Sequence, residues 1–292
     1  MLIGALEAGG TKMVCATGDE TGKIFERESF PTLTPDETLP VLTEWFRARG
    51  VEALGIGAFG PTGVDPAAEN FGDILETPKV AWRGCHLRQA FVDALGVPVG
   101  YDTDVNVACL GEATFGDSRG IDDLVYVTIG TGVGAGVMLG GRLLHGMLHP
   151  EAGHMLVTRV AGDNGPCHCP SHACCLEGMA AGPSIQARWG KPAVELADRA
   201  EVWELEGDYL AQMCANLVLC YSPRRIILGG GVMHQEQLYA IVRKKTLDYL
   251  GGYITAAELT DIDSYITAPS LADNQGAMGA LELGRRALLA SK

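Results

Sequence analysis

The chain has 292 residues, enough for one large or two medium-sized domains, and its 47% hydrophobic and 20% charged residues are typical of a soluble globular protein. No apolar run approaches the roughly 20 residues needed to span a bilayer, and the first residues lack the basic region and apolar stretch of a signal peptide. The 22 basic and 36 acidic residues give a formal charge of −14, which opposes binding to nucleic acid or to an anionic membrane surface.

The nine cysteines are distributed unevenly along the chain. Four of them lie in the stretch "CHCPSHACC" at 167–175, together with two histidines. The other five stand singly in apolar stretches, as buried small hydrophobic residues do in proteins from a reducing compartment. They are Cys15, Cys85, Cys109, Cys214 and Cys220. We therefore predict a cytoplasmic protein without a disulfide framework.

Residues 2–104 predict three strands followed by two helix–strand pairs. Glycine-containing turns separate the first three strands, and the helix after them is amphipathic, with Leu39, Leu42, Trp45 and Phe46 on one side. The predicted strands are 2–7, 13–17, 23–30, 53–59 and 97–104, and the predicted helices are 35–50 and 86–96.

The same pattern recurs about 120 residues later. Three strands again come first, and the turn "GTGVG" follows the first of them. Helices and one further strand come later in the sequence. The strands are 123–129, 135–139, 142–146 and 225–231, and the helices are 176–189, 201–221 and 274–290. This duplication predicts an α/β protein of two halves, each a mixed sheet flanked by helices. Because no Pro-rich linker separates the halves, we expect them to share a cleft.

The two Gly-Thr turns occupy equivalent positions in the two halves. In "EAGGTK" (7–12), glycines let the backbone come close to a ligand and point N–H groups at phosphate oxygens, although an ordinary hairpin turn has the same composition. The second turn, "GTGVGAG" (130–136), loosely fits a dinucleotide-binding fingerprint. That fingerprint requires a helix after the glycines, and a hairpin follows here, so the sequence argues against a Rossmann fold and a zinc-dependent oxidoreductase.

A third group of glycines, Gly229–Gly231, ends the strand 225–231 and precedes an amphipathic helix. Such a junction suits an anionic ligand at a helix N-terminus, but close packing of strand against helix explains it equally well. The pattern GxxxxGK[ST] is absent from the sequence, which excludes P-loop kinases and ATPases.

Asp102 and Asp104 lie at the end of the strand 97–104, before a helical stretch. An acidic residue or threonine there is a favoured N-cap, worth ~1 kcal/mol. The functional alternative is that one of the two carboxylates acts as a general base at the mouth of the cleft.

The cluster at 167–175 predicts a metal site. Tetrahedral zinc needs four nitrogen or sulfur ligands, and short spacings supply several of them from one turn. One set is Cys169, His172 and Cys175 with His154 as the fourth ligand, and a competing set uses Cys167, Cys169 and Cys174.

Nine segments taken together resemble the ROK sugar kinases, and within them the bacterial fructokinase branch. They are "EAGGTK", "TPKVAWRG", "TDVN", "TIGTGVGAG", "HPEAGH", "CPSHACCLEG", "AGPSI", "WELEG" and "IILGGGV", and they extend over nearly the whole chain. The resemblance implies a duplicated, actin-like (ribonuclease H-like) ATPase fold with a central nucleotide and sugar cleft. It also implies ATP with Mg²⁺, a free hexose substrate, a structural Zn²⁺ and a homodimer.

The resemblance assigns roles to residues. Asp104 matches the catalytic base. The residues that match ATP and phosphate positions are Gly9, Gly10, Thr11, Lys12, Thr131, Gly132, Gly182, Pro183, Gly229, Gly230 and Gly231. Those that match sugar positions are Gly60, Pro61, Thr103, Glu151, His154 and Glu177. The matching zinc ligands are His154, Cys169, His172 and Cys175, because "CLEG" anchors the branch pattern on Cys175. We expect a small domain at 1–107, on which a helix at 275–292 packs back, and a large domain at 108–274.

Two positions depart from the family pattern. Glu7 stands where aspartate is common, which leaves the handling of Mg²⁺ open, and Thr103 stands where asparagine is common, which alters one sugar contact. Fructose is the expected substrate, with mannose, glucose and N-acetylmannosamine as alternatives. Some ROK proteins are sugar-responsive repressors, but these carry a helix-turn-helix before the first phosphate turn, which here begins at residue 7.

Overall fold

The computed structural model describes residues 1–292, whose contacts divide the chain into two compact units. The first unit comprises residues 1–120, 142–150 and 270–292, and the second comprises residues 121–141 and 151–269. The first break therefore falls at residue 120 and not at 107. The reason is that helix α3 (Asp104–Phe115) packs along the C-terminal helix α10 (Gln275–Ala290) within the first unit.

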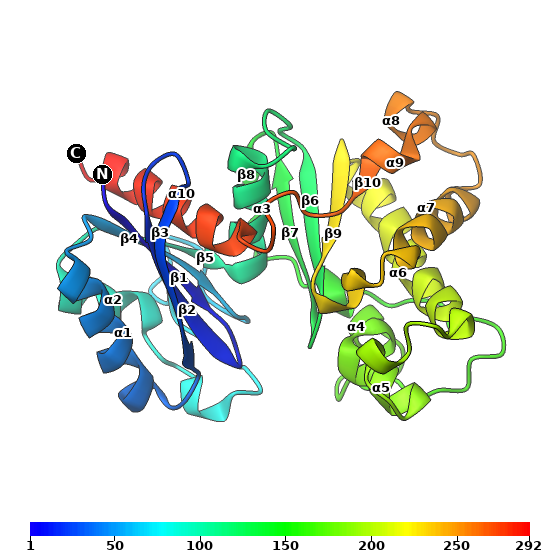
Figure 1. Cartoon of the computed structure of the whole chain (residues 1–292), viewed down its shortest axis with the longest axis horizontal. Helices are drawn as coiled ribbons and strands as arrows, with labels where there is room; N and C mark the ends of the chain where they lie inside the picture. Colours follow the sequence, from blue (N-terminus) through cyan, green and yellow to red (C-terminus); the bar gives the residue numbers. More distant parts are fainter. The chain divides into compact units, whose positions relative to one another are not determined.

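The first unit contains a mixed five-stranded sheet with the order β3-β2-β1-β4-β5 (Figure 1). Its strands are β1 (Ile3–Ala8), β2 (Lys12–Gly18), β3 (Ile24–Pro31), β4 (Ala53–Ala58) and β5 (Val99–Thr103). β1 and β2 form an antiparallel hairpin, whereas β4 and β5 run parallel to β1. The register places Glu7 beside Gly57, and Gly57 beside Asp102. The carboxyl ends of three strands thus bring these positions to one edge of the sheet.

Alternating side chains of this sheet face two layers of helices. Leu6 and Ala8 pack in the core with residues of α1 (Pro35–Arg49) and α2 (Leu87–Leu95). Ile3 and Ala5 pack with residues of α3 and α10. The approach of α10 is close enough that a Cβ on Gly55 would lie 1.9 Å from the carbonyl oxygen of Ala280. Both layers exclude water from β1, β2, β4 and β5, which are buried over most of their length, whereas the edge strand β3 is mostly exposed.

The second unit repeats the hairpin of the first. Its sheet has the order β10-β9-β6-β7-β8, with β6 and β7 antiparallel and β9 parallel to β6. The strands are β6 (Leu124–Ile129), β7 (Val133–Leu139), β9 (Arg225–Gly229) and β10 (Ile266–Thr267), and the two residues of the edge strand β8 (Arg142–Leu143) are grouped by their contacts with the first unit. The strand predicted at 142–146 is only two residues long, and residues 144–146 have irregular backbone structure.

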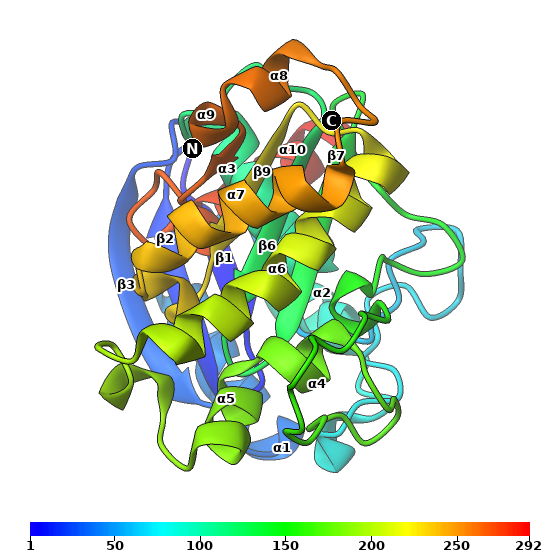
Figure 2. The same cartoon turned by 90° about the vertical axis from the view of Figure 1, so that its right-hand side faces the viewer.

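Helices α6 (Ala200–Tyr221) and α7 (Gln237–Leu250) pack against each other over the second sheet (Figure 2). The predicted helix 176–189 is two helices, α4 (Leu176–Ala180) and α5 (Gly182–Trp189). Pro183 explains the break, since a proline ring clashes with the carbonyl group of a preceding helical turn and lacks an N–H donor. The remaining short helices are α8 (Ala257–Thr260), α9 (Ile262–Tyr265), η1 (Val80–Trp82), η2 (Ala152–His154), η3 (Ala193–Glu195) and η4 (Gly231–His234).

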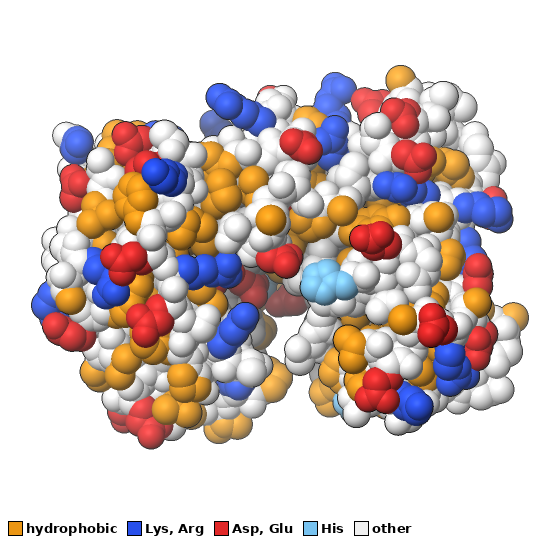
Figure 3. All heavy atoms as spheres, viewed as in Figure 1, with side chains coloured by type: hydrophobic (Ala, Val, Ile, Leu, Met, Phe, Trp, Pro, Cys, Tyr) orange, Lys and Arg blue, Asp and Glu red, His pale blue; other side chains and the backbone are white.

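The helices differ in length and burial, but none combines the length and apolar character required to cross a membrane. On the face drawn in Figure 3, Lys and Arg side chains are interspersed with Asp and Glu, and no continuous basic patch is visible within either unit. This distribution agrees with the acidic balance of the sequence.

Candidate functional site

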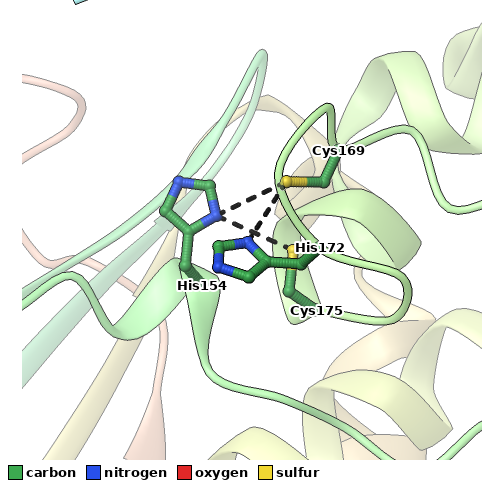
Figure 4. A group of neighbouring side chains, drawn as sticks. All are labelled: His154, Cys169, His172 and Cys175. Atoms are coloured by element: carbon green, nitrogen blue, oxygen red, sulfur yellow. Dashed lines mark hydrogen bonds between the residues drawn. The ribbon is translucent and has the colours of Figure 1, made fainter. Parts of the chain in front are cut away.

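Four side chains from two segments of the second unit meet in a compact cluster (Figure 4). The ligand atoms of His154, Cys169, His172 and Cys175 all lie within 4.8 Å of one another. Nδ1 of His154 lies 3.7 Å from Sγ of Cys175 and 3.9 Å from Sγ of Cys169. Nδ1 of His172 lies 3.4 Å from Sγ of Cys169. The cluster is therefore built around Nδ1 of both imidazoles and two thiols.

These distances approach those of a tetrahedral zinc site. Zinc–ligand bonds of about 2.0–2.3 Å place the ligand atoms of a tetrahedron roughly 3.3–3.8 Å apart, and two histidines with two cysteines are a common donor set. Burial raises the pKa of the Cys175 thiol to about 12, and a bound cation would offset this penalty by stabilising the thiolate. The competing set is not assembled, because the Cys167 thiol instead donates to the carbonyl oxygen of His172 at 3.2 Å.

Local backbone structure brings these ligands together. Cys175 is the N-cap of α4, where its sulfur accepts a hydrogen bond from the N–H of Gly178 at 3.4 Å. His154 ends the short helix η2, and an isolated bridge pairs Leu156 with Cys175. The loop that carries Cys169 crosses α4 so closely that a Cβ on Gly178 would lie 2.8 Å from Cβ of Cys169.

Glu177, in the first turn of α4, joins this cluster to the second Gly-Thr turn. Its Oε2 accepts a hydrogen bond from the N–H of Val133 at 2.9 Å, and its Oε1 lies 3.9 Å from Nε2 of His154. Gly182, which begins α5, donates its N–H to the carbonyl oxygen of Gly130 at 2.8 Å. The second turn, the imidazole of His154 and the carboxylate of Glu177 therefore form one continuous group within the second unit.

The first Gly-Thr turn lies in the first unit, between β1 and β2. The N–H of Gly9 donates to the carbonyl oxygen of Lys12 at 3.1 Å, which closes the turn. Just before it, Glu7 is paired with Arg27 at 3.2 Å, and a Cβ on Gly276 would lie 2.5 Å from Oε2 of Glu7. The carboxylate is thus held against the N-terminus of α10. Desolvation raises the pKa of Glu7, while the charges of Arg27 and Lys12 oppose this rise.

Asp104 begins α3, but it is not the N-cap. Thr103 takes that role, since its hydroxyl accepts a hydrogen bond from the N–H of Asn106 at 3.2 Å and is buried. Asp104 retains exposed surface, but protein atoms crowd around its carboxylate, whose Oδ1 accepts a hydrogen bond from the N–H of Val105 at 2.8 Å. Desolvation raises the pKa of Asp104 to about 6, and the charge of Glu7 adds to this rise. A carboxylate with such a pKa can accept a proton near neutral pH.

Asp102, the alternative base, lies in a different environment from Asp104. It is 3% exposed, and its carboxylate accepts hydrogen bonds from the N–H of Thr103 at 2.8 Å and from Nδ2 of Asn106 at 2.7 Å. Its second oxygen lies 2.9 Å from Nε2 of His145. With both oxygens occupied, Asp102 is placed to organise its neighbours and not to receive a proton from a substrate.

The triple glycine departs from the expected strand–glycine–helix junction. Gly230 has a φ of 88°, and η4 follows, so that α7 begins only at Gln237. Added Cβ atoms on Gly229 and Gly230 would lie 2.7 Å from Oη of Tyr126 and 2.5 Å from the carbonyl oxygen of Ile129. Close packing therefore explains these two glycines. Gly231 differs, because a Cβ there would meet no atom within 4 Å.

A model of the ROK family matches residues 3–287. The chain belongs to the ROK family. It is 46% identical over 290 residues to a putative fructokinase of Bacillus subtilis, covering 99% of this chain and 97% of the relative. It is 43% identical over 288 residues to a fructokinase of Pediococcus pentosaceus, covering 99% of each.

A solved structure of a ROK glucokinase from Streptomyces griseus, in complex with glucose and AMPPNP, has a TM-score of 0.78 with this chain. The two are 26% identical, and the match covers 98% of this chain and 100% of the other. The expected α/β fold with two sheets, of the actin-like ATPase type, is confirmed for this ROK protein by that similarity and by the repeated hairpin units.

The structure also reveals polar residues of this ROK protein that the sequence patterns did not single out. Nε2 of His145 is hydrogen-bonded to Oδ2 of Asp102, and Nε2 of His149 accepts a hydrogen bond from the N–H of Thr62 at 3.3 Å. Thr62 follows the cis Gly60–Pro61 bond, and its hydroxyl is hydrogen-bonded to Tyr101. The only signal in the sequence was the pair of histidines in "HGMLHP", four residues apart, which spacing alone does not connect to Asp102.

Proposed function

We propose that this chain is an ATP-dependent hexose kinase, and specifically a fructokinase that forms fructose 6-phosphate and ADP. The observation that carries the proposal is the position of Asp104, which retains exposed surface at the sheet edge that also carries the first Gly-Thr turn and whose pKa desolvation raises to about 6. Identity of 46% and 43% to proteins named as fructokinases supports fructose over mannose, glucose and N-acetylmannosamine.

In phosphoryl transfer the protein mainly orients the reactants and neutralises charge. The sugar 6-hydroxyl gives its proton to Asp104 as its oxygen bonds to the γ-phosphorus, and the bond from that phosphorus to the bridging oxygen of ADP breaks. Mg²⁺ bound to ATP neutralises charge on the phosphates. The proposed ATP contacts are Gly9, Gly10, Thr11, Lys12, Thr131, Gly132, Gly182, Pro183, Gly229, Gly230 and Gly231. Among the last three, Gly231 has the open space that a ligand requires.

We assign sugar binding to Gly60, Pro61, Glu151, His154 and Glu177. Thr103 contributes less than the resemblance implies, because its hydroxyl is engaged in the cap of α3. The zinc ion that His154, Cys169, His172 and Cys175 would hold is structural. It would fix the orientation of His154 and leave Nε2 free to meet a sugar hydroxyl. From the family resemblance we also expect a homodimer, and we expect it to be located in the cytoplasm.

The test is release of ADP from MgATP with fructose, mannose, glucose and N-acetylmannosamine. We expect the highest kcat/KM with fructose, and a 6-phosphate as the product by NMR. If only another hexose is phosphorylated, the assigned substrate changes and the proposed mechanism stands. Absence of turnover with all four sugars, in protein that contains zinc, would contradict the assignment as a hexose kinase.

A further inference from the structure

A short strap, residues 142–150, belongs to the first unit although the chain on both sides of it belongs to the second. Only one residue of the strap, His149, is buried, and the side chain of Met147 is fully exposed. Leu143, Leu144 and Leu148 are half-buried, so apolar burial supplies part of what holds the strap, because hydrophobic stabilisation scales with the area removed from water. Polar contacts supply the rest.

Two histidines make those contacts. Nε2 of His145 lies 2.9 Å from Oδ2 of Asp102, and Nε2 of His149 accepts the N–H of Thr62 at 3.3 Å. The residue that follows the strap is Glu151, one of the proposed sugar ligands. The two histidines thus fasten to the first unit the segment that leads directly to Glu151.

The carboxylate of Asp102 has a second function in the same place. Its Oδ1 accepts from Nδ2 of Asn106, which lies in the first turn of α3, the helix that begins with Asp104. A buried carboxylate is tolerated only when its oxygens are hydrogen-bonded, so removing one partner disturbs the others. Asp102 therefore links the strap to the start of the helix that carries the proposed base.

We propose that His145 is a positioning residue for phosphoryl transfer: bound to Asp102, it fastens the strap that leads to Glu151 to the same carboxylate that braces the start of α3, where Asp104 lies. The inference rests on the proposed function. It adds a residue that touches neither the phosphate turns nor the metal cluster, and it gives Asp102 a role other than that of a base.

Protonation strengthens this contact. The hydrogen bond and charge of Asp102 raise the pKa of His145, and Asp65 adds to the rise. The other titratable group nearby, His149, is kept neutral because burial lowers its pKa. Below its raised pKa, His145 makes a charge-assisted hydrogen bond, and above it the neutral ring donates a weaker one. We expect the KM for sugar of the wild-type protein to rise as the pH rises through that pKa.

The experiment compares His145→Ala, His145→Gln and Asp102→Asn in the full chain, with His86→Ala as the matched control. His86 makes the same kind of contact, with Nδ1 lying 2.9 Å from Oδ1 of Asp73, but its side chain is 75% exposed and lies outside the site. Since a misplacement of about 1 Å can cost ~100-fold, we expect His145→Ala to raise the KM for fructose by about 10-fold or more. The KM for MgATP should stay within about 2-fold, and His86→Ala should resemble the wild-type protein in both constants.

Two further readouts separate positioning from a general loss of structure. Glutamine keeps an N–H donor for Asp102, so His145→Gln should recover most of the sugar affinity and abolish its pH dependence. Residues that act as a unit are non-additive, so His145→Ala with Asp102→Asn should cost no more than the worse single variant. A sugar KM of His145→Ala equal to that of His86→Ala, in a protein that does phosphorylate hexose, would overturn the proposal and leave the kinase assignment intact.

If the wild-type protein phosphorylates no hexose, the proposed function fails, and the contact itself is tested by hydrogen exchange. Backbone amides of residues 142–150 should exchange at least about 10-fold faster in His145→Ala than in His86→Ala. Equal rates would overturn the role of His145 in holding the strap. Should the alanine variant fail to fold, His145→Gln is compared with the wild-type protein at pH values below and above the raised pKa of His145. At the higher pH, the wild-type protein should show a higher sugar KM and weaker protection of the strap amides, whereas His145→Gln should show no change in either.

Discussion

Nε2 of His154 lies 3.9 Å from Oε1 of Glu177, on the side of the ring away from the thiols that surround Nδ1. An imidazole bound to a metal through Nδ1 carries its hydrogen on Nε2, so the metal fixes both its tautomer and its orientation. Glu177 is itself held by the backbone of the second Gly-Thr turn. The proposed zinc site would therefore set the geometry of two sugar-binding side chains at once.

The identity of the zinc ligands can be tested by serine substitution. We expect purified protein to contain about one zinc ion per chain, as structural sites do. Cys169→Ser and Cys175→Ser should lose the metal, because their thiols face His154. Metal analysis after gel filtration gives the measurement.

Two other cysteines of the same stretch provide the control. Cys167→Ser and Cys174→Ser should retain the metal, since neither thiol belongs to the cluster of four. Loss of zinc from these variants, with retention in Cys169→Ser and Cys175→Ser, would favour a different ligand set.

In the metal-free variants we expect the KM for sugar to rise by ~10-fold or more, because supporting contacts of a metal site typically contribute 10–100-fold.

Asp104→Asn should remove the base and leave the fold unchanged. A positioned base contributes ~10²–10⁴-fold, so kcat with fructose should fall by at least about 100-fold. Binding of fructose, measured by calorimetry, should change little. Asp93→Asn, on the solvent side of α2, is the matched control and should keep wild-type turnover. Comparable activity of the two variants would remove Asp104 from the mechanism.

The pH profile follows from the raised pKa of Asp104. Because the base acts only when it is deprotonated, kcat/KM for sugar should fall as the pH drops below about 6, and a decline at higher pH should come only from the contact of His145. Since the folded-state pKa exceeds the ordinary 3.8, ionisation costs stability as the pH rises between these values. Asp104→Asn should therefore be more stable than wild type above pH about 6 in urea unfolding. A wild-type profile without a break near this pH would contradict the assignment.

Gly178→Ala tests the packing between α4 and the cysteine loop. The added Cβ would lie 2.2 Å from Sγ of Cys167 and 3.0 Å from the backbone nitrogen of Cys169, so the loop would have to move. Overpacking of this kind costs about 1–3 kcal/mol, and we expect a lower Tm and reduced zinc content. Gly130→Ala is the control, because its Cβ meets no atom within 4 Å. Equal zinc content and Tm in both variants would show that the loop is not held against α4.

Sequence patterns predicted most of the elements, because hydrophobic periodicity and glycine-containing turns are local properties of the chain. The hairpins β1–β2 and β6–β7 and the helices α1, α2 and α6 lie within a few residues of their predicted bounds. The errors have different origins. Pro183 is a local helix breaker that the prediction of one helix at 176–189 did not take into account. The strand predicted at 142–146 is only two residues long, and no local signal marks its end.

The sequence by itself determined the repeated hairpins with their Gly-Thr turns, the Cys169–His172–Cys175 spacing and the placement of Asp104 at a strand end. Each depends on residues that are neighbours in the chain, where spacing fixes distance. Tertiary structure alone decided that Glu177 lies on the second turn and that His145 pairs with Asp102 from 43 residues away. Such contacts depend on how strands and helices pack, and no local periodicity records that packing.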